Sequence, residues 1–321
     1  MKDWTAGRGF SVRYNMSQKS EKFIHTDRCP ICFSPWLRHY KKGTFNFNHL
    51  HKEQVKITDR EYGKIWDLDE CQECGHVFAN PSPAPDFIFA LYQEIEDPSY
   101  EEEAEGRSRN FLRILRQLEK FQPSKGILFD VGAATGILLH LARRNGWRTD
   151  GIEASAWAAR LASKKYQLHF RQGFFEQTEL ESGSCQAVTM IDYIEHTPKP
   201  REAVAKAIQI LSPGGILCLV TPDIHSAAAR ITGRKWWHCR PAHLAYFSLQ
   251  SLSRLLEGTG FMILKKRKYA WTFSAHYLLS RKNIFNFITR NPRTASFLRA
   301  IPIKLALGDS FEIYAQKDSC S

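Results

Sequence analysis

The sequence predicts an α/β fold, in which a doubly wound, mainly parallel sheet follows a small N-terminal module. Three observations support this prediction. Apolar runs typical of strands alternate with segments of helical periodicity from residue 126 to residue 317. One strand–helix junction carries the glycine-containing turn "DVGAATG", and two Cys-x-x-C pairs precede the alternating region.

Composition sets the limits of the interpretation. The chain has 321 residues, enough for one large domain and a small one, and a formal net charge of +12. It has no run of 18 apolar residues, and its first 24 residues lack the apolar core of a secretory signal. We therefore expect a flexible leader over 1–24 and a cytoplasmic protein.

The two cysteine pairs, Cys29/Cys32 and Cys71/Cys74, predict a metal site in a module spanning residues 25–84. Two thiolates spaced by two residues hold one ion from a tight turn, and a second such turn completes a tetrahedron of sulfur around zinc. Two disulfides or a redox motif are the alternatives, which a cytoplasmic location and the presence of two pairs disfavour. With four cysteine ligands the zinc is expected to be structural, in a zinc ribbon with short strands at 42–50 and 63–70. Five histidines nearby are spare candidate ligands: His25, His39, His49, His51 and His76.

A helical connector is predicted over residues 85–123. A proline-rich break precedes a short helix, and "RSRNFLRILRQLEKF" then places apolar residues on one face of a longer helix. Tyr92 and Tyr100 in this connector either pack or reach over a neighbouring pocket.

The glycine turn predicts a nucleotide site. Asp130 ends a strand, and Gly132 and Gly136 let the backbone approach a ligand at the start of the next helix. Glu153 ends the second strand, 21 residues after Gly132, where a carboxylate is placed to bind both ribose hydroxyls. A dinucleotide fingerprint would also need glycine at positions 134 and 137, which hold alanine and isoleucine. Adenosine binding therefore fits, and pyrophosphate binding does not.

The alternation continues to the end of the chain. A helix at 154–166, a third strand near 168–177, a fourth at 185–192, a helix at 199–211 and a fifth strand at 216–223 follow in order. A helix at 249–260 then precedes strands at 261–271 and 310–317. Ligands bind at the carboxyl ends of parallel strands. Four such ends carry candidate residues: Asp130, Glu153, Gly173–Phe174 and Asp192.

These residues resemble the class I S-adenosylmethionine-dependent methyltransferases. The matching motifs are "DVGAATG", "GIEAS", "DYIEHTPKP" and "LSPGGILCLVTPD", in order over about residues 124–265. The cysteine module looks like that of sugar C-methyltransferases, and "EHTPKP…LSPGG…RPAHLAYFS" resembles ubiquinone-pathway O-methyltransferases.

The resemblance implies a Rossmann-like sheet of seven strands, the last one antiparallel, in a domain spanning 124–321. It also implies that S-adenosylmethionine is the cofactor. Asp130, Gly132 and Gly136 would surround its methionine part, Glu153 would bind its ribose, and Phe174 would lie beside its adenine.

The stretch "DYIEHTPKP" (Asp192–Pro200) gathers groups that hold a proton or a metal ion. A hydroxyl acceptor must lose a proton when it is methylated, so a base beside the transferred methyl group is useful. His196 and Glu195 are the candidates from this stretch, with His243 as a further candidate base.

The resemblance adds two roles for the same stretch. Tyr193 to His196 resemble a substrate-contacting cluster of the sugar enzymes. Asp192, Glu195 and His196 resemble a cluster that holds a divalent cation in the quinone enzymes, so metal-assisted deprotonation is a second mechanism. The remaining alternative is that His196 fixes its loop by hydrogen bonding to the backbone.

Positive charge is concentrated near the end of the chain. Residues 265–304 contain ten Lys and Arg and no Asp or Glu. A helical insertion predicted at about 272–304 would cover the acceptor site, either as a solvated lid or in contact with anionic lipid, a nucleotide-sugar phosphate or nucleic acid.

Three functions remain open from the sequence. The first is methyl transfer to oxygen or activated carbon of a small molecule, namely a sugar or nucleotide sugar, a quinone or a secondary metabolite, with an anionic or lipid-linked acceptor included. The second is an RNA methyltransferase with the ribbon as its RNA-binding module, which the weakly basic ribbon disfavours. The third is a cofactor-binding scaffold without activity.

Overall fold

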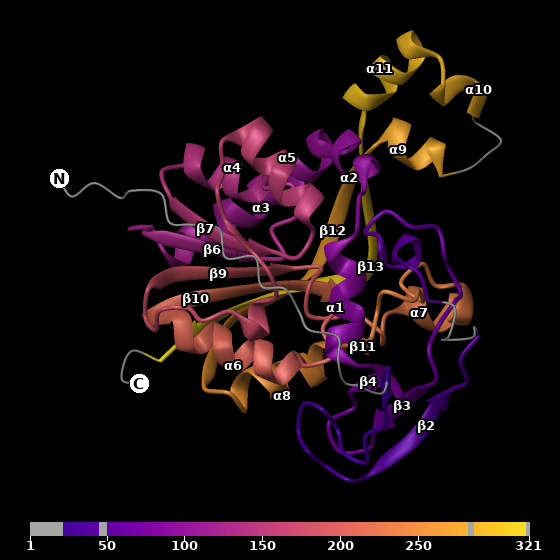
Figure 1. Ribbon diagram of the computed structural model, residues 1–321, viewed down its shortest axis with the longest axis vertical. Coiled ribbons are helices and arrows are strands. Elements are labelled where there is room, and N and C mark those ends of the chain that lie inside the picture. The colour runs from indigo at the N-terminus through magenta and orange to yellow at the C-terminus, as the bar shows by residue number, and fades with distance from the viewer. Residues whose placement is uncertain (1–21, 45–49, 282–285, 319–321) are drawn as a thin grey trace.

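The computed structural model describes residues 22–44, 50–281 and 286–318, and its main body is a seven-stranded sheet between two layers of helices (Figure 1). The strand order is β12-β13-β10-β9-β6-β7-β8, and only β13 runs antiparallel to its neighbours. This confirms the predicted seven-stranded sheet and its antiparallel last strand. The strands are β6 (Ile127–Val131), β7 (Arg148–Glu153), β8 (Arg171–Gln172), β9 (Cys185–Ile191), β10 (Leu211–Pro222), β12 (Phe261–Ser274) and β13 (Pro302–Lys317).

The central strands are apolar on both faces because helices cover both sides of the sheet. In β10, Leu217 and Leu219 pack into the core on one face, whereas Cys218 and Val220 pack into the core on the other. Parallel register between β9 and β6 aligns Asp130 with Thr189, so the carboxyl ends of these strands meet at one edge of the sheet.

Helices α3, α4 and α5 lie on one face of the sheet, and α6 and α8 lie on the other (Figure 1). The long helix α3 buries Phe111, Ile114, Leu115 and Leu118, as its apolar spacing predicts. Helix α8 begins at a capping box in which Ser248 and Ser251 exchange hydrogen bonds. These helices are α3 (Ala104–Phe121), α4 (Ile137–Arg144), α5 (Ala156–Tyr166), α6 (Pro200–Ile210) and α8 (Leu249–Glu257).

The cysteine module forms a separate four-stranded antiparallel sheet, and one of its strands comes from a later part of the chain. Its order is β11-β4-β3-β2, and its outer strand β11 (Ala245–Tyr246) comes from the segment after the fifth strand of the large sheet. The ring of His76 packs against Phe247 at a centroid distance of 4.6 Å. The other strands are β2 (Leu37–Lys41), β3 (Leu68–Cys71) and β4 (Val77–Ala79).

The connector and the loop after β10 bring further segments to the carboxyl edge of the large sheet. Helix α1 (Pro85–Gln93) starts with proline at its first position, where the missing N–H costs nothing. Helices α2 (Pro98–Glu102) and α7 (Ala227–Thr232) and the 3₁₀ turns η2 (Lys52–Val55), η3 (Phe175–Gln177) and η4 (Gly233–Lys235) complete this edge.

Several predicted boundaries need correction. Phe23–Ile24 belong to strand β1, paired with β5 (Ser82–Pro83), and are not part of the leader, whose first 21 residues lie outside the described residues. The strand expected from residue 63 begins only at Leu68, because a turn precedes it. The strand expected at 42–50 falls mostly on residues 45–49, also outside the described residues. The third strand of the large sheet is reduced to the two residues of β8 at its edge.

The predicted insertion is shorter than expected. Residues 271–274 and 302–305 pair as a continuation of the β12–β13 hairpin, so strands occupy both ends of the predicted range. Between these strands, the described residues form three short helices: α9 (Ala275–Ser280), α10 (Asn286–Thr289) and α11 (Pro292–Ala300). Pro292 starts α11, as its break in the pattern predicts.

Candidate active site

A cavity opens at the carboxyl edge of the large sheet. The turn after β6 lines it through Gly132, Ala134 and Thr135. The end of β7 contributes Glu153 and the loop after β8 contributes Phe174. The position is the one expected for a ligand site of an open parallel sheet.

The glycine turn is held in a conformation that needs glycine at its first position. Gly132 has a φ of +72°, and a Cβ there would lie 3.0 Å from the ring of Tyr193. The backbone N–H groups of Gly132 and Ala133 both donate to the carbonyl of Ile152, at 3.0 Å. The turn therefore brings bare backbone to the cavity wall and packs its other side against the loop after β9.

Glu153 connects the turn to the end of β7. One carboxylate oxygen accepts from the backbone N–H of Ala134 and the other from that of Ser155, both at 2.7 Å. Burial raises the pKa of the Glu153 carboxyl group, and these N–H groups oppose the rise. The carboxylate is thus fixed at the cavity wall with acceptor capacity left for hydroxyl groups.

Asp130 and Gly136 lie on either side of the glycine turn but do not line the cavity themselves. Asp130 is buried, accepts a hydrogen bond from the Thr189 hydroxyl at 2.6 Å, and has a pKa that burial raises to about 7. Gly136, with a φ of +80°, starts α4 at a point where a Cβ would lie 2.8 Å from Leu168. Neither residue is among those that line the cavity.

A second cavity adjoins the first and shares Gly132, Asp192 and His196 with it. Asp192 has a φ of +50°, so the chain turns sharply where β9 ends. Burial raises the pKa of the Asp192 carboxyl to about 7, against the lowering effect of the nearby Arg107 and Arg240 guanidinium groups. A ligand in either cavity would therefore meet the loop that follows β9.

Glu195, His196 and His243 converge between these cavities and the core. One ligand atom from each lies within 4.8 Å of the others. One carboxylate oxygen of Glu195 accepts from the Thr221 hydroxyl at 2.9 Å. The other oxygen is buried without a hydrogen-bond partner among the described residues. Burial, together with the charge of Asp192, raises the Glu195 pKa well above its ordinary value.

Comparison with known proteins decides the family. The family model described as "Methyltransferase domain" matches residues 100–266, which is more than half of the chain. The chain belongs to the methyltransferase domain family.

Two curated proteins resemble parts of this methyltransferase domain. The ubiquinone biosynthesis O-methyltransferase of Nitrosococcus oceani is 33% identical over 94 residues, or 27% of this chain and 40% of that protein. The protein of the same description from Xanthomonas axonopodis pv. citri is 31% identical over 125 residues, or 37% of this chain and 52% of that protein. The matches thus span about half or less of the length of these relatives.

A solved structure is also similar. The magnesium protoporphyrin IX methyltransferase of Synechocystis PCC 6803, with bound SAH, is 13% identical, with a TM-score of 0.47. The match covers 70% of this chain and 89% of that one.

His196 of the methyltransferase domain has a defined tautomer. Its Nδ1 lies 2.9 Å from the carbonyl oxygen of Ala242 and 3.2 Å from the Tyr92 hydroxyl. Because a carbonyl oxygen only accepts, Nδ1 carries the hydrogen and Nε2 keeps its lone pair. Burial lowers the His196 pKa to about 3, so the ring is neutral near neutral pH.

Tyr193 and Asp192 fall outside this cluster. The Tyr193 hydroxyl donates to Glu176 at 2.9 Å, which leaves its ring as a wall of the first cavity. Asp192 is not among the three residues that could share one metal ion. The third residue of that group is His243, where the prediction had Asp192. The structure therefore groups Glu195, His196 and His243 rather than Asp192, Glu195 and His196.

The sequence analysis missed two site residues. Arg107 on α3 is 9% exposed, stacks on the Tyr100 ring at 3.7 Å and lines the second cavity. His238 also lines that cavity, with its Nε2 3.4 Å from a carboxylate oxygen of Asp309 on β13. No local pattern marks these residues, because they come from elements distant in the chain. The sequence leaves open whether Trp236 lines an acceptor pocket or packs. Its side chain is buried and lines neither cavity.

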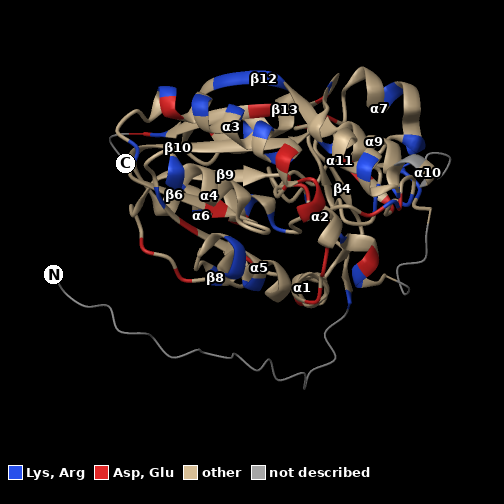
Figure 2. Ribbon diagram, turned by 90° about the horizontal axis from the view of Figure 1, so that it is seen from above, with Lys and Arg blue, Asp and Glu red and all other residues tan. Residues whose placement is uncertain are grey.

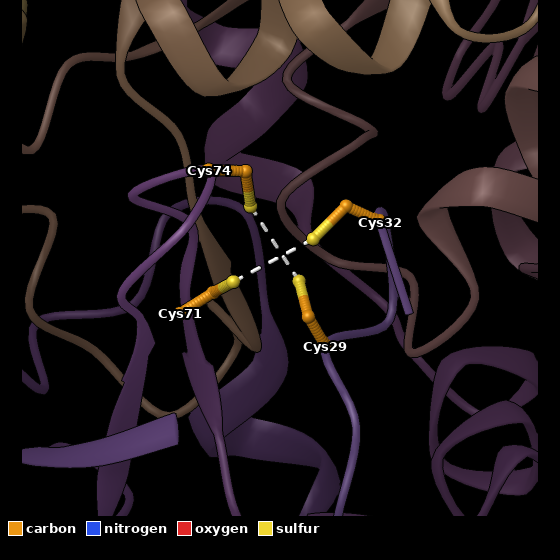
Figure 3. A group of neighbouring side chains, drawn as sticks. All are labelled: Cys29, Cys32, Cys71 and Cys74. Carbon is orange, nitrogen blue, oxygen red and sulfur yellow. Dashed lines mark hydrogen bonds between the residues drawn. The ribbon is translucent and has the colours of Figure 1, made fainter. Parts of the chain in front are cut away.

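The four cysteines of the two Cys-x-x-C pairs lie together in the cysteine module (Figure 3). Their Sγ atoms all lie within 4.8 Å of one another. Sγ of Cys29 is 3.6 Å from that of Cys74, and Sγ of Cys32 is 3.5 Å from that of Cys71. Four sulfurs around zinc at about 2.3 Å stand about 3.8 Å apart, so the cluster has the dimensions of a tetrahedral site.

Proposed function

We propose that this protein is an S-adenosylmethionine-dependent methyltransferase that acts on oxygen or activated carbon of a small molecule. The observation that carries the proposal is the pair of adjoining cavities. The first has the glycine turn and Glu153 at its wall, and the second shares Asp192 and His196 with it. One cavity for a cofactor and one for an acceptor, meeting at a proton-accepting cluster, is the arrangement that methyl transfer needs.

The residues present fit S-adenosylmethionine. Glu153 has two fixed carboxylate oxygens for the ribose hydroxyls, and Phe174 offers an apolar surface for the adenine. Arg107 lines the second cavity next to Gly132 and has no carboxylate within ion-pair distance among the described residues. A guanidinium in that position suits the α-carboxylate of the methionine part.

The first prediction concerns the cofactor. Calorimetry is expected to show binding of S-adenosylmethionine, and Glu153→Gln is expected to weaken it about 10- to 100-fold, because hydrogen bonds to a charged group are lost. Glu179→Gln, at an exposed position that does not line the first cavity, is the matched control and should bind normally. No heat with the unmodified protein would refute cofactor binding.

His196 is the proposed proton acceptor. Its Nε2 lone pair is the free one, and the Glu195 carboxyl group belongs to the same cluster. When bound, the cofactor supplies the electrophilic methyl group. The chain's own contribution is to orient the acceptor hydroxyl toward that group and to remove its proton.

A divalent cation is a second way to achieve the same deprotonation. One carboxylate and two imidazoles, from Glu195, His196 and His243, form a donor set suited to such an ion. His196 presents neutral Nε2, the form that binds metal, while its Nδ1–H donates to a backbone carbonyl.

The acceptor is proposed to be a sugar or nucleotide sugar, a quinone or a secondary metabolite. The resemblance to two ubiquinone biosynthesis O-methyltransferases favours a phenolic hydroxyl among these. The second cavity, with the aromatic rings of Tyr100, Phe111 and Trp271 at its wall, suits a flat ring.

The second prediction separates acceptor classes. With methyl-labelled cofactor, label is expected to enter catechols or quinols, or nucleotide sugars, and not RNA. Label found in RNA alone would establish the alternative, an RNA methyltransferase. Cofactor binding without transfer to any of the three would favour a non-catalytic scaffold.

We also infer that the cysteine cluster holds one structural zinc ion. All four ligands are protein thiols, so no coordination position is left open for chemistry. Metal analysis of the purified protein should find about one zinc per chain. We further propose that residues 25–84, 85–123 and 124–321 act as ribbon, connector and cofactor-binding domain.

A further inference from the structure

The described residues 275–281 and 286–301, here called the basic excursion, extend from the far end of the β12–β13 hairpin (Figure 1). Of its three described helices only α11 carries basic residues, Arg293 and Arg299, and none of the three carries an acidic residue (Figure 2). Helices α9, α10 and α11 pack against one another, with Ala295 and His276 among their buried residues. The excursion is therefore a small folded unit held on a stalk.

Its charges differ from those on the neighbouring strand. On β12, Lys265 donates to Gln117, Arg267 pairs with Glu312 and Lys268 pairs with Asp223. On the excursion, three exposed cations have no carboxylate within ion-pair distance in the described part of the chain: Arg290, Arg293 and Arg299. Two cations of β12 thus pair with carboxylates, whereas the arginines of the excursion pair with none among the described residues.

The same surface exposes two large apolar side chains. Phe287 on α10 is 75% exposed and Phe297 on α11 is 69% exposed. Arg293 and Phe297 are four residues apart, so they share one face of α11. Only Ala295 of α11 is buried, so most side chains of this helix are at least partly exposed to solvent.

We propose that the basic excursion docks on an anionic lipid bilayer. Phenylalanine enters the interface between headgroups and acyl chains, while flanking arginines bind the anionic headgroups, as in interfacial helices. Both features lie together here, and the absence of acidic residues from the whole segment makes the surface complementary to negative charge. No helix of the described residues is long and apolar enough to cross a bilayer, so the contact would be peripheral.

The excursion also reaches the rim of the first cavity. Arg281, at the end of α9, donates to the carbonyls of Thr58 and Asp59. Ile57, next to them in the chain, lines both cavities. Docking would hold the cavities near the membrane surface. On the basis of the proposed function, this favours an acceptor that resides in the bilayer.

Vesicle sedimentation tests the docking without cofactor or acceptor, so its result is independent of methyl transfer. The intact protein is expected to bind vesicles of equal parts phosphatidylcholine and phosphatidylglycerol, and not vesicles of phosphatidylcholine alone. Arg293→Gln with Arg299→Gln should weaken binding about 25-fold, at about fivefold for each charge. Phe287→Ser with Phe297→Ser should weaken it about tenfold or more.

Matched controls come from surfaces away from the excursion. Arg144→Gln with Arg148→Gln removes two exposed charges near β7, and Met262→Ser removes an exposed apolar side chain at the start of β12. Both should bind as the unmodified protein does. Failure to bind anionic vesicles, or equal weakening in the controls, would overturn the proposal. Tighter binding of single-stranded RNA through the same arginines and phenylalanines would replace the bilayer with nucleic acid.

Discussion

Removal of the metal from the cysteine cluster is expected to lower the melting temperature by about 10 °C or more. A structural zinc ion contributes several kcal/mol or more to folding, and about 1 kcal/mol shifts the melting temperature of a chain this large by about 2–4 °C or less. Cys71→Ser should have the same effect, because three thiolates hold zinc far less tightly than four. Calorimetry with and without a chelator measures both.

The loss of stability on zinc removal is expected to extend beyond the cysteine module. Cys29, Cys71 and Cys74 belong to the same buried cluster as Phe129 and Phe247 of the main body. Strand β4 pairs with β11, and the adjacent Leu244 and Ala245 N–H groups donate to the carbonyl of Glu195 at 2.8 and 3.0 Å. A disordered module would therefore loosen the segment that positions His243 and the Glu195 backbone, and turnover should fall with stability.

Cys185→Ala is the control for the metal site. Cys185 is buried in the main body and is not one of the four clustered cysteines. This variant should retain zinc and lose only the roughly 1 kcal/mol expected for a small buried side chain. Zinc content below that of the unmodified protein would show that the cluster is not where the metal is bound. An unchanged melting temperature after complete zinc removal would contradict a structural role.

The sequence predicts most of the large sheet because its signals are local. Each of these signals, namely the apolar runs, the glycine turn and the spacing to Glu153, depends on a few neighbouring residues. The apolar runs form the strands of the sheet, and the glycine turn and Glu153 lie at one edge of it. The pairing of β11 with β4 could not be predicted in this way. It involves two residues of a loop more than 160 positions away in the chain, and tertiary packing decides it.

The candidate site was only partly predictable for the same reason. His196 and Glu195 stand out because they follow a buried strand, whereas Arg107, Tyr92 and His238 acquire meaning only from the neighbours that folding gives them. Asp130 shows what the position near a strand end leaves open. It is the last but one residue of β6, accepts a hydrogen bond from Thr189 and does not line the first cavity.

His196→Ala is expected to reduce turnover about 10²- to 10⁴-fold while S-adenosylmethionine binds with unchanged affinity. The ring lies at the meeting point of the two cavities, so the cofactor wall formed by Gly132 and Glu153 stays intact without it. His169→Ala, at an exposed position near β8, is the control and should retain full turnover. Steady-state rates with the acceptor found in the labelling screen provide the measurement.

The three interpretations of His196 give different patterns with added reagents. If its Nε2 is the base, free imidazole should partly restore the His196→Ala variant, and a chelator should leave the zinc-loaded unmodified enzyme active. If Glu195, His196 and His243 hold a divalent cation, chelation should abolish turnover before the protein unfolds, and one added metal should restore it. If the ring only fixes its loop through the carbonyl of Ala242, His196→Asn, which can keep a donor at that position, should retain turnover where His196→Ala does not. Unchanged turnover in both variants would remove His196 from the mechanism.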